Sequence, residues 1–170
     1  MCKWRDLKPQ PAINDLENLI SEVESDEFKS KIFLSLGEIH LSIDNSELAF
    51  NNFDKGANLS KNRLLREQVY FQIAEISFQK TDFDKALESY QKVLSNTVSI
   101  TRIQDSNLKM VQIYRLRGEL EKSANKIQEL IIDEDFSSIK SDLDLELTKI
   151  EFDRGKIDFA IQNYDRIGKD

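Results

Sequence analysis

Residues 71–94 read FQIAEISFQKTDFDKALESYQKVL, and the spacing of their apolar side chains decides the fold. Apolar and small residues recur three and four positions apart on both sides of Thr81 and Asp82. Residues with this spacing line one face of a helix. Thr and Asp favour a turn or the first residue of a helix. The stretch therefore predicts two amphipathic helices joined by a tight turn.

The second helix of this pair has counterparts every 37 residues along the chain. A small residue recurs at this interval, a large apolar residue follows four positions later, and a third column follows after three more. These columns are Ala12, Ala49, Ala86, Ser123 and Ala160; Leu16, Phe53, Tyr90, Ile127 and Tyr164; and Leu19, Gly56, Val93, Leu130 and Ile167. Antiparallel helices cross closely where one of them carries a small side chain. We therefore expect buried columns, with Ala86 at a helix crossing and Tyr90 between repeats.

A matching face precedes each of the last four of these helices, again at the 37-residue interval. Its members are Phe33, Leu36, Gly37 and His40; Tyr70, Ile73, Ala74 and Ser77; Asn107, Met110, Val111 and Tyr114; and Asp144, Leu147, Thr148 and Glu151. Between the two faces lie Asp44, Thr81, Gly118 and Gly155, where Gly suits a left-handed residue and Asp or Thr suits a turn. Each repeat is thus predicted to be helix, turn, helix. Such pairs bury their faces only when they stack.

Residues 71–94 resemble a tetratricopeptide repeat. The matching positions are Tyr70, Ile73, Ala74, Phe83, Ala86, Tyr90, Val93 and Leu94. Residues 34–59 are similar through Leu36, Gly37, Ala49 and Phe53, and residues 105–132 through Gly118 and Leu130. The family's usual period is 34, so this chain would be a variant with longer repeats. The resemblance implies an all-α, right-handed α-solenoid of antiparallel helix pairs.

The repeat register gives a domain map. We expect an irregular leader over residues 1–11, followed by a single array over 12–170. A helix at 12–24 would cap the N-terminal end of the array. The four repeats that follow are predicted at 29–60, 64–96, 102–133 and 138–168.

Resemblance to this family implies a module that holds a peptide or helix of a partner protein in a concave groove lined by first helices. The positions expected to line it are Leu34, Glu38, Leu41, Phe71, Glu75, Phe78, Leu108, Gln112, Arg115, Leu145, Lys149 and Phe152. An apolar lining of this kind suits a hydrophobic peptide or an amphipathic helix. The alternative is that the same side chains are core, buried between helices that are longer than usual.

Some members of the family clamp a carboxylate with Lys and Asn on successive first helices. The corresponding positions here hold Leu34, Glu38, Gln72, Asp105 and Lys109. Because Glu38 and Asp105 would repel a carboxylate, this mode of binding is not expected.

The charge balance weighs against nucleic acid. The net charge of the 170 residues is −7, and only residues 61–130 carry a net positive charge, +3. The basic side chains there include Lys61, Arg63, Arg66, Arg102, Lys109, Arg115 and Arg117. A helical repeat that binds RNA is therefore the weaker alternative, since phosphate recognition needs a basic surface.

The chain is poorly equipped for catalysis. It has one Cys and one His, and His40 falls in the interior column of its helix, where a packed side chain is expected. The acidic run Asp133-Glu134-Asp135 lacks the spacing of a calcium loop and is read as a solvated turn. We expect neither enzymatic activity nor a cofactor or metal site.

The two ends of the sequence suggest surroundings for the array. Cys2, followed by a short polar stretch, is similar to the start of a mature bacterial lipoprotein, which would place the protein in the periplasm or at the outer membrane. Otherwise the cytoplasm is the default expectation. No apolar run is long enough to cross a bilayer. Residues 157–167 are more apolar than one inward face requires, which predicts a sticky edge covered by further repeats or by a second copy of the chain.

Overall fold

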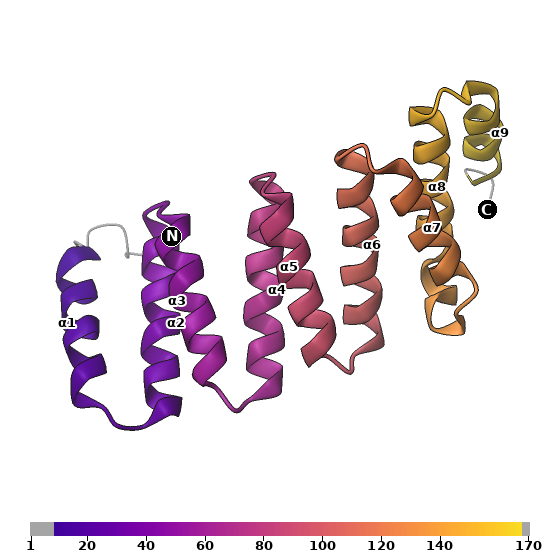
Figure 1. Ribbon diagram of the computed structural model, residues 1–170. Coiled ribbons are helices and arrows are strands. Elements are labelled where there is room, and N and C mark those ends of the chain that lie inside the picture. The colour runs from indigo at the N-terminus through magenta and orange to yellow at the C-terminus, as the bar shows by residue number, and fades with distance from the viewer. Residues whose placement is uncertain (1–8, 168–170) are drawn as a thin grey trace, which may run out of the picture. The chain divides into compact units, whose positions relative to one another are not determined.

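The computed structural model describes residues 9–167, which form nine α-helices and one 3-10 helix and no strand (Figure 1). The helices are α1 (Pro9–Glu22), α2 (Asp26–Ser42), α3 (Ser46–Leu59), α4 (Arg63–Gln79), α5 (Phe83–Asn96), α6 (Ile100–Leu116), α7 (Leu120–Ile131), η2 (Glu134–Ile139), α8 (Lys140–Asp153) and α9 (Ile157–Ile167). The chain divides into an N-terminal unit that ends at Glu75 and a C-terminal unit that begins at Ile76, with the border inside α4.

Side-chain caps set where several helices begin. Ser25 Oγ accepts from the N–H of Phe28, and Ser99 Oγ accepts from the N–H of Arg102. Asn45 and Asp82 cap α3 and α5 in the same way. Each cap satisfies an N–H that has no partner within its helix. The Ser caps start α2 at residue 26 and α6 at residue 100, before the expected 29 and 102.

The four expected breaks are turns in which the backbone is left-handed. Its φ is 58° at Asp44, 59° at Thr81, 76° at Gly118 and 82° at Gly155. The helices that follow these turns begin at residues 46, 83, 120 and 157, each 37 residues after the one before. Asp44 and Thr81 thus occupy a conformation that side chains disfavour, instead of an ordinary turn or cap position.

Helices α1 and α2 share a core cluster in the N-terminal unit. Ile13 of α1 is buried with Ile32 and Leu36 of α2, and further apolar side chains of both helices pack around them. Ala12 is exposed, so its expected place in the buried small-residue column is wrong. The helix that such a residue would cross lies before it in every later pair, and no helix precedes α1 in the described chain. Instead α1 packs on α2, the helix that follows it.

The pair α2 and α3 packs closely because glycines remove side chains from the crossing. A Cβ atom at Gly37 would stand 2.5 Å from the ring of Phe53, and one at Gly56 would stand 2.8 Å from Leu34. Ser30 Oγ donates to the carbonyl oxygen of Gly56 at 2.7 Å, which satisfies a buried hydroxyl. Any larger residue at either glycine would push the two helices apart.

In the C-terminal unit, one core cluster joins four consecutive elements. It contains Val111, Ala124, Ile127, Leu130, Phe136, Leu143 and Ile150, which come from α6, α7, η2 and α8. Ser123 takes the small-residue position, and its Oγ donates to the carbonyl oxygen of Val111 at 2.8 Å. Ala86, Tyr90 and Ala160 are also buried, as the columns predict. Tyr164 is exposed, against expectation, because no described element covers the outer side of α9.

The first helix of the last repeat starts late. η2 occupies residues 134–139, so α8 begins at Lys140 and not at the expected 138. Phe136 of η2 is buried, and the Gln104 amide of α6 donates to the Asp135 carbonyl and to Ser138 Oγ. These contacts fasten the connection to α6.

The N-terminal end also differs from the expected map. Helix α1 starts at Pro9, inside the expected leader, because proline is tolerated in a first turn, where the N–H has no helical partner anyway. Residues 1–8, including Cys2, lie outside the described residues. Among the helices of residues 9–167, none is both long and apolar enough to cross a membrane.

Candidate functional site

The twelve positions expected to line a groove fall on first helices, and none of them is fully buried. Leu34, Glu38 and Leu41 lie on α2, and Phe71 and Glu75 lie on the part of α4 in the N-terminal unit. In the C-terminal unit, Phe78 ends α4, Leu108, Gln112 and Arg115 lie on α6, and Leu145, Lys149 and Phe152 lie on α8. Glu38 and Phe152 are exposed and the other ten are half-buried.

Contacts distinguish these positions from one another. Leu34 lies against the backbone of Gly56, so it is part of the α2–α3 packing. The ring centroids of Phe78 and Phe83 are 6.2 Å apart. The Lys109 ammonium lies 4.6 Å from the centroid of the Phe78 ring. Such a cation and a neighbouring ring each hold an aromatic side chain in place. Leu34 and Phe78 therefore have structural partners already.

A buried carboxylate organises the face that α6 and α8 share. Glu146 is 3% exposed, and its Oε1 accepts from Lys149 Nζ at 2.7 Å and from Gln112 Nε2 at 3.2 Å. Its Oε2 accepts from Arg115 Nε at 3.2 Å. Arg115 also reaches Asp153, with Nη1 to Oδ2 at 3.1 Å. Every oxygen of the buried carboxylate is therefore hydrogen-bonded, which offsets the cost of its burial.

This network brings together three expected groove residues, Gln112, Arg115 and Lys149, through two that the sequence did not single out. Glu146 and Asp153 were missed because a charged side chain on a helix is ordinarily solvated. The only signal in the sequence is helical spacing, since Glu146, Lys149 and Asp153 are three and four positions apart. We call these five residues the Glu146 network. Leu108, Leu145 and Phe152 are the apolar groove positions on the same two helices.

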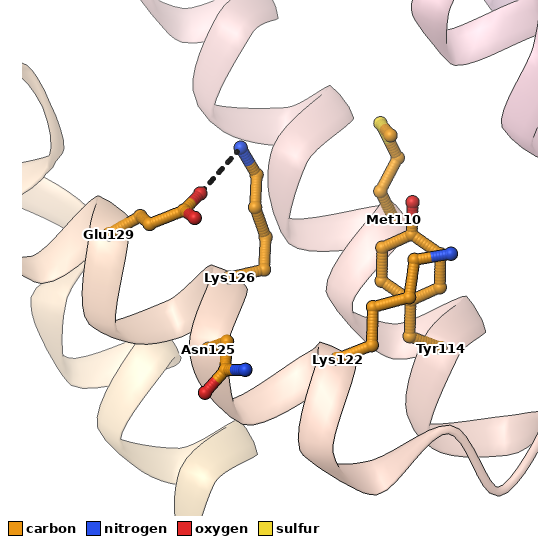
Figure 2. A pocket seen from close by; sticks show the side chains of 6 residues that line it. All are labelled: Met110, Tyr114, Lys122, Asn125, Lys126 and Glu129. Carbon is orange, nitrogen blue, oxygen red and sulfur yellow. Dashed lines mark ion pairs between the residues drawn. The ribbon is translucent and has the colours of Figure 1, made fainter.

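A shallow hollow of about 440 Å³ lies elsewhere in the C-terminal unit, between α6 and α7. It is lined by Met110, Tyr114, Lys122, Asn125, Lys126 and Glu129. Figure 2 shows the Lys122 side chain lying over the ring of Tyr114, with the ammonium 4.1 Å from the ring centroid. Lys126 pairs with Glu129 at 3.6 Å. Both lysines thus already have partners, and the hollow offers no concentrated charge.

An ion-pair cluster holds the corner between α8 and α9. Glu151 is buried and bonds to Lys156 and Arg154, and Arg154 Nη2 also pairs with Glu121 Oε1 at 2.8 Å. The Lys156 hydrogen bond lowers the pKa of Glu151 below 4.5, with a further contribution from Arg154, while burial acts in the opposite direction. The corner therefore keeps a carboxylate ionised.

The remaining candidate residues do not assemble into a chemical site. His40 is buried, and its Nδ1 has no hydrogen-bond partner in the described part of the chain. Asp133 caps η2 through the N–H of Asp135, and all three acidic residues of this run are exposed. Among residues 9–167, no three His, Cys, Asp or Glu side chains are grouped as a metal site.

Several basic side chains of the middle segment are paired with acids. Arg115 binds Glu146 and Asp153, and Arg117 binds Asp84 and Glu119. Lys109, which the carboxylate clamp would need, lies over Phe78.

No protein-family model matches this chain, and no curated protein is similar to it. Solved structures do resemble it. The crystal structure of MamA matches with a TM-score of 0.61 and 15% identity, over 95% of this chain and 87% of that one. A MamA RS-1 ArsTM double mutant matches with a TM-score of 0.61 and 14% identity, over 97% and 86%.

The apo form of RapI matches with a TM-score of 0.63 and 17% identity. The match covers 97% of this chain, which spans only 65% of the length of RapI. MamA and RapI are helical solenoids of the tetratricopeptide type. At these identities the likeness concerns the fold alone. It confirms the expected fold class: the chain is an all-α solenoid of tetratricopeptide-like helix pairs.

Proposed function

We propose that this protein is a non-enzymatic scaffold that binds a peptide or helix of a partner protein on the face shared by α6 and α8. The chain would be a variant of the tetratricopeptide type with 37-residue repeats. The fold supports this proposal because solenoids of paired helices offer extended surfaces for protein partners. The likeness to MamA and RapI supports it only through the shared fold.

The observation that carries the proposal is the Glu146 network. Arg115 and Lys149 are held in place by a buried carboxylate. Binding therefore costs little side-chain entropy at these two residues, because they are already ordered. Phe152, 52% exposed, adds an apolar contact on α8. An ordered polar network and an exposed aromatic group on the same face fit a segment that carries both a polar and an apolar side chain.

The test selects peptides from a displayed random library on the intact chain and then measures their affinity for variants. Phe152→Ala and Lys149→Glu should each weaken the selected peptides by about tenfold or more, since central aromatic and charged contacts carry most of the binding energy. Phe28→Ala is the matched control, because Phe28 is 46% exposed but lies in the first turn of α2.

Thermal melting separates binding from folding. Phe152 is 52% exposed, so Phe152→Ala should melt within a few degrees of the parent chain. Lys149→Glu should melt lower, because it places a second carboxylate beside the buried Glu146, so Phe152→Ala is the variant that separates binding from folding. Peptides that bind both variants as tightly as the parent would show that this face is not the binding surface. The double variant Phe71→Ala with Phe78→Ala examines the alternative that groove positions are core: unfolding would place these two rings in the core.

A further inference from the structure

The last helix of the described chain carries an uncovered apolar stripe. Ile157, Ile161 and Tyr164 of α9 are 52%, 53% and 41% exposed, and they lie four and three positions apart. This spacing gathers them on one face of the helix. Ala160 of the same helix is buried, so α9 is docked by another side. In Figure 1, α9 lies beside α8 at the C-terminal end of the chain.

The same positions are covered in the earlier repeats of the C-terminal unit. One repeat before the stripe, α7 has Leu120, Ala124 and Ile127, which belong to or pack against the core cluster that α8 completes with Leu143 and Ile150. Two repeats before it, α5 has Phe83 and Leu87, both half-buried, and Tyr90, fully buried. The α9 stripe is therefore equivalent to the apolar faces of α5 and α7, which are covered by α6 and α8.

A charge pattern accompanies this interface. Asp84, in the first turn of α5, pairs with Arg117, the C-cap of α6, at 2.6 Å. Glu121, in the first turn of α7, pairs with Arg154, the C-cap of α8, at 2.8 Å. The acids and the arginines are each 37 residues apart. Each covering helix thus ends in an arginine that reaches back to the acid of the helix it covers.

Asp158 is the next acid in this series. It lies in the first turn of α9, 37 residues after Glu121, and it is exposed. Within residues 9–167 no basic side chain forms an ion pair with it. Both parts of the interface, an apolar stripe and an acid at its N-terminal edge, are present on α9 without a covering helix.

We propose that the Ile157, Ile161 and Tyr164 face of α9 docks an amphipathic α-helix of a partner protein, which carries an aliphatic stripe and ends in an arginine or lysine that pairs with Asp158. The chemistry of this helix is that of α8 and α6. The surface is separate from the α6–α8 face of the proposed function, so either can fail without the other.

The experiment uses a fluorescein-labelled peptide that copies residues 140–156, which include α8 and Arg154, with a lactam bridge to hold the helix. Fluorescence anisotropy with the intact chain should show saturable binding. Ile161→Lys should weaken it by roughly tenfold or more, because it places a charge where an aliphatic side chain would be buried. Gln162→Lys, an exposed neighbour outside the stripe, is the matched control and should leave binding unchanged.

Charge reversal tests the ion pair. Asp158→Arg should weaken the peptide by about threefold to tenfold, since it replaces an attraction at the surface by a repulsion. A peptide with Arg154→Glu should restore the affinity of that variant. Absence of saturable binding, equal affinity for Ile161→Lys, or no recovery with the reversed peptide would each overturn the proposal.

Sedimentation equilibrium of the chain alone tests whether a second copy of the chain covers this face. A monomer across a hundredfold range of concentration agrees with a site that awaits a partner helix. A dimer that Ile161→Lys dissociates would mean that a second copy of the chain covers the face, and the proposed occupant would be wrong.

Discussion

The first and last helices of the described chain differ in how well their apolar side chains are covered. In α1, Ile13 is buried, Leu16, Leu19 and Ile20 are half-buried, and the residues on the other side are mostly polar. In α9, Ala160 is buried, while Ile157, Phe159, Ile161 and Tyr164 are exposed. Each helix has one neighbouring helix in the described chain. The apolar surface of α1 matches one neighbour, and that of α9 exceeds it.

This difference shows that a column identifies equivalent positions in successive repeats. Whether such a position is buried depends on the helices around it. A column position is buried when helices lie on both of its sides, as for Ile127 of α7, which packs with side chains of α6 and α8. Within the described residues, α1 and α9 each lack one of these helices, and Ala12 of the small-residue column and Tyr164 of the large-residue column are exposed. A polar outer face is what a solenoid needs where it stops. By this measure the outer face of α1 is mostly polar and that of α9 is not.

The largest expected effect compares two tyrosines of one column. Tyr90→Ala should lower the free energy of unfolding by about 3–5 kcal/mol, because it leaves a cavity in a fully buried site. Tyr164→Ala should change it by less than ~1 kcal/mol, because that ring is exposed. Urea denaturation of both variants measures the difference. Equal losses would mean that α9 is covered as α5 is.

The second comparison uses the small-residue column. Ala86→Leu should cost about 1–3 kcal/mol of stability, since it overfills a buried helix crossing. Ala12→Leu, at the equivalent position of α1, should cost less than ~0.5 kcal/mol because Ala12 is exposed. The urea midpoints of the two variants and the parent chain measure this difference in stability. A large cost at Ala12 would mean that the outer face of α1 is covered and not free.

A smaller effect compares the turns before α7 and α9. Gly118 and Gly155 have φ of 76° and 82°, and an added Cβ would meet nothing within 4 Å at either one. Gly118→Ala should therefore cost about 1–2 kcal/mol through backbone strain alone. Gly155→Ala should cost less in global unfolding, because α9 can undock locally and relieve the strain. Equal shifts in the melting temperature would mean that α9 is as firmly held as α7.

The smallest effect is in the pH dependence of the α8–α9 corner. Because the pKa of Glu151 is lowered in the fold, its ion pairs stabilise the protein fully above the ordinary value of 4.5. This contribution is lost as the pH falls below 4.5 through the folded pKa. Glu151→Gln should therefore reduce stability at neutral pH and make its decline below pH 4.5 shallower. Urea midpoints of parent and variant at a series of pH values measure both, and parallel curves would contradict the assignment.

The sequence predicted the fold well where periodicity determines it. The second helices begin at residues 46, 83, 120 and 157, which is where the spacing of apolar columns and turn residues puts them within one residue. The starts of α2 and α6 were less accurate, because single serine caps at Ser25 and Ser99 set them and periodicity does not register a cap. The late start of α8 depends on η2, whose buried Phe136 lies outside any column.

The candidate site was harder to predict. Helical spacing placed Gln112, Arg115 and Lys149 on first helices, and all three are half-buried there. It could not find Glu146, which joins them, because the partners from α6 are 31 and 34 residues away in the chain. A charged residue between Leu145 and Leu147 gives no sign that its carboxylate is buried. Only the packing of α6 against α8 brings these groups within hydrogen-bonding distance.

The short span of these interactions has a consequence for how the chain folds. The hydrogen bonds that join α6 to α8 span about one repeat, for example 38 residues from Arg115 to Asp153. Low contact order of this kind shortens the search for native contacts, and folding can begin at any helix pair and spread to its neighbours. The closely packed pair α2–α3 is a natural place to begin. Unfolding should start instead at α9, whose backbone amides are expected to exchange with solvent deuterium before those of α6.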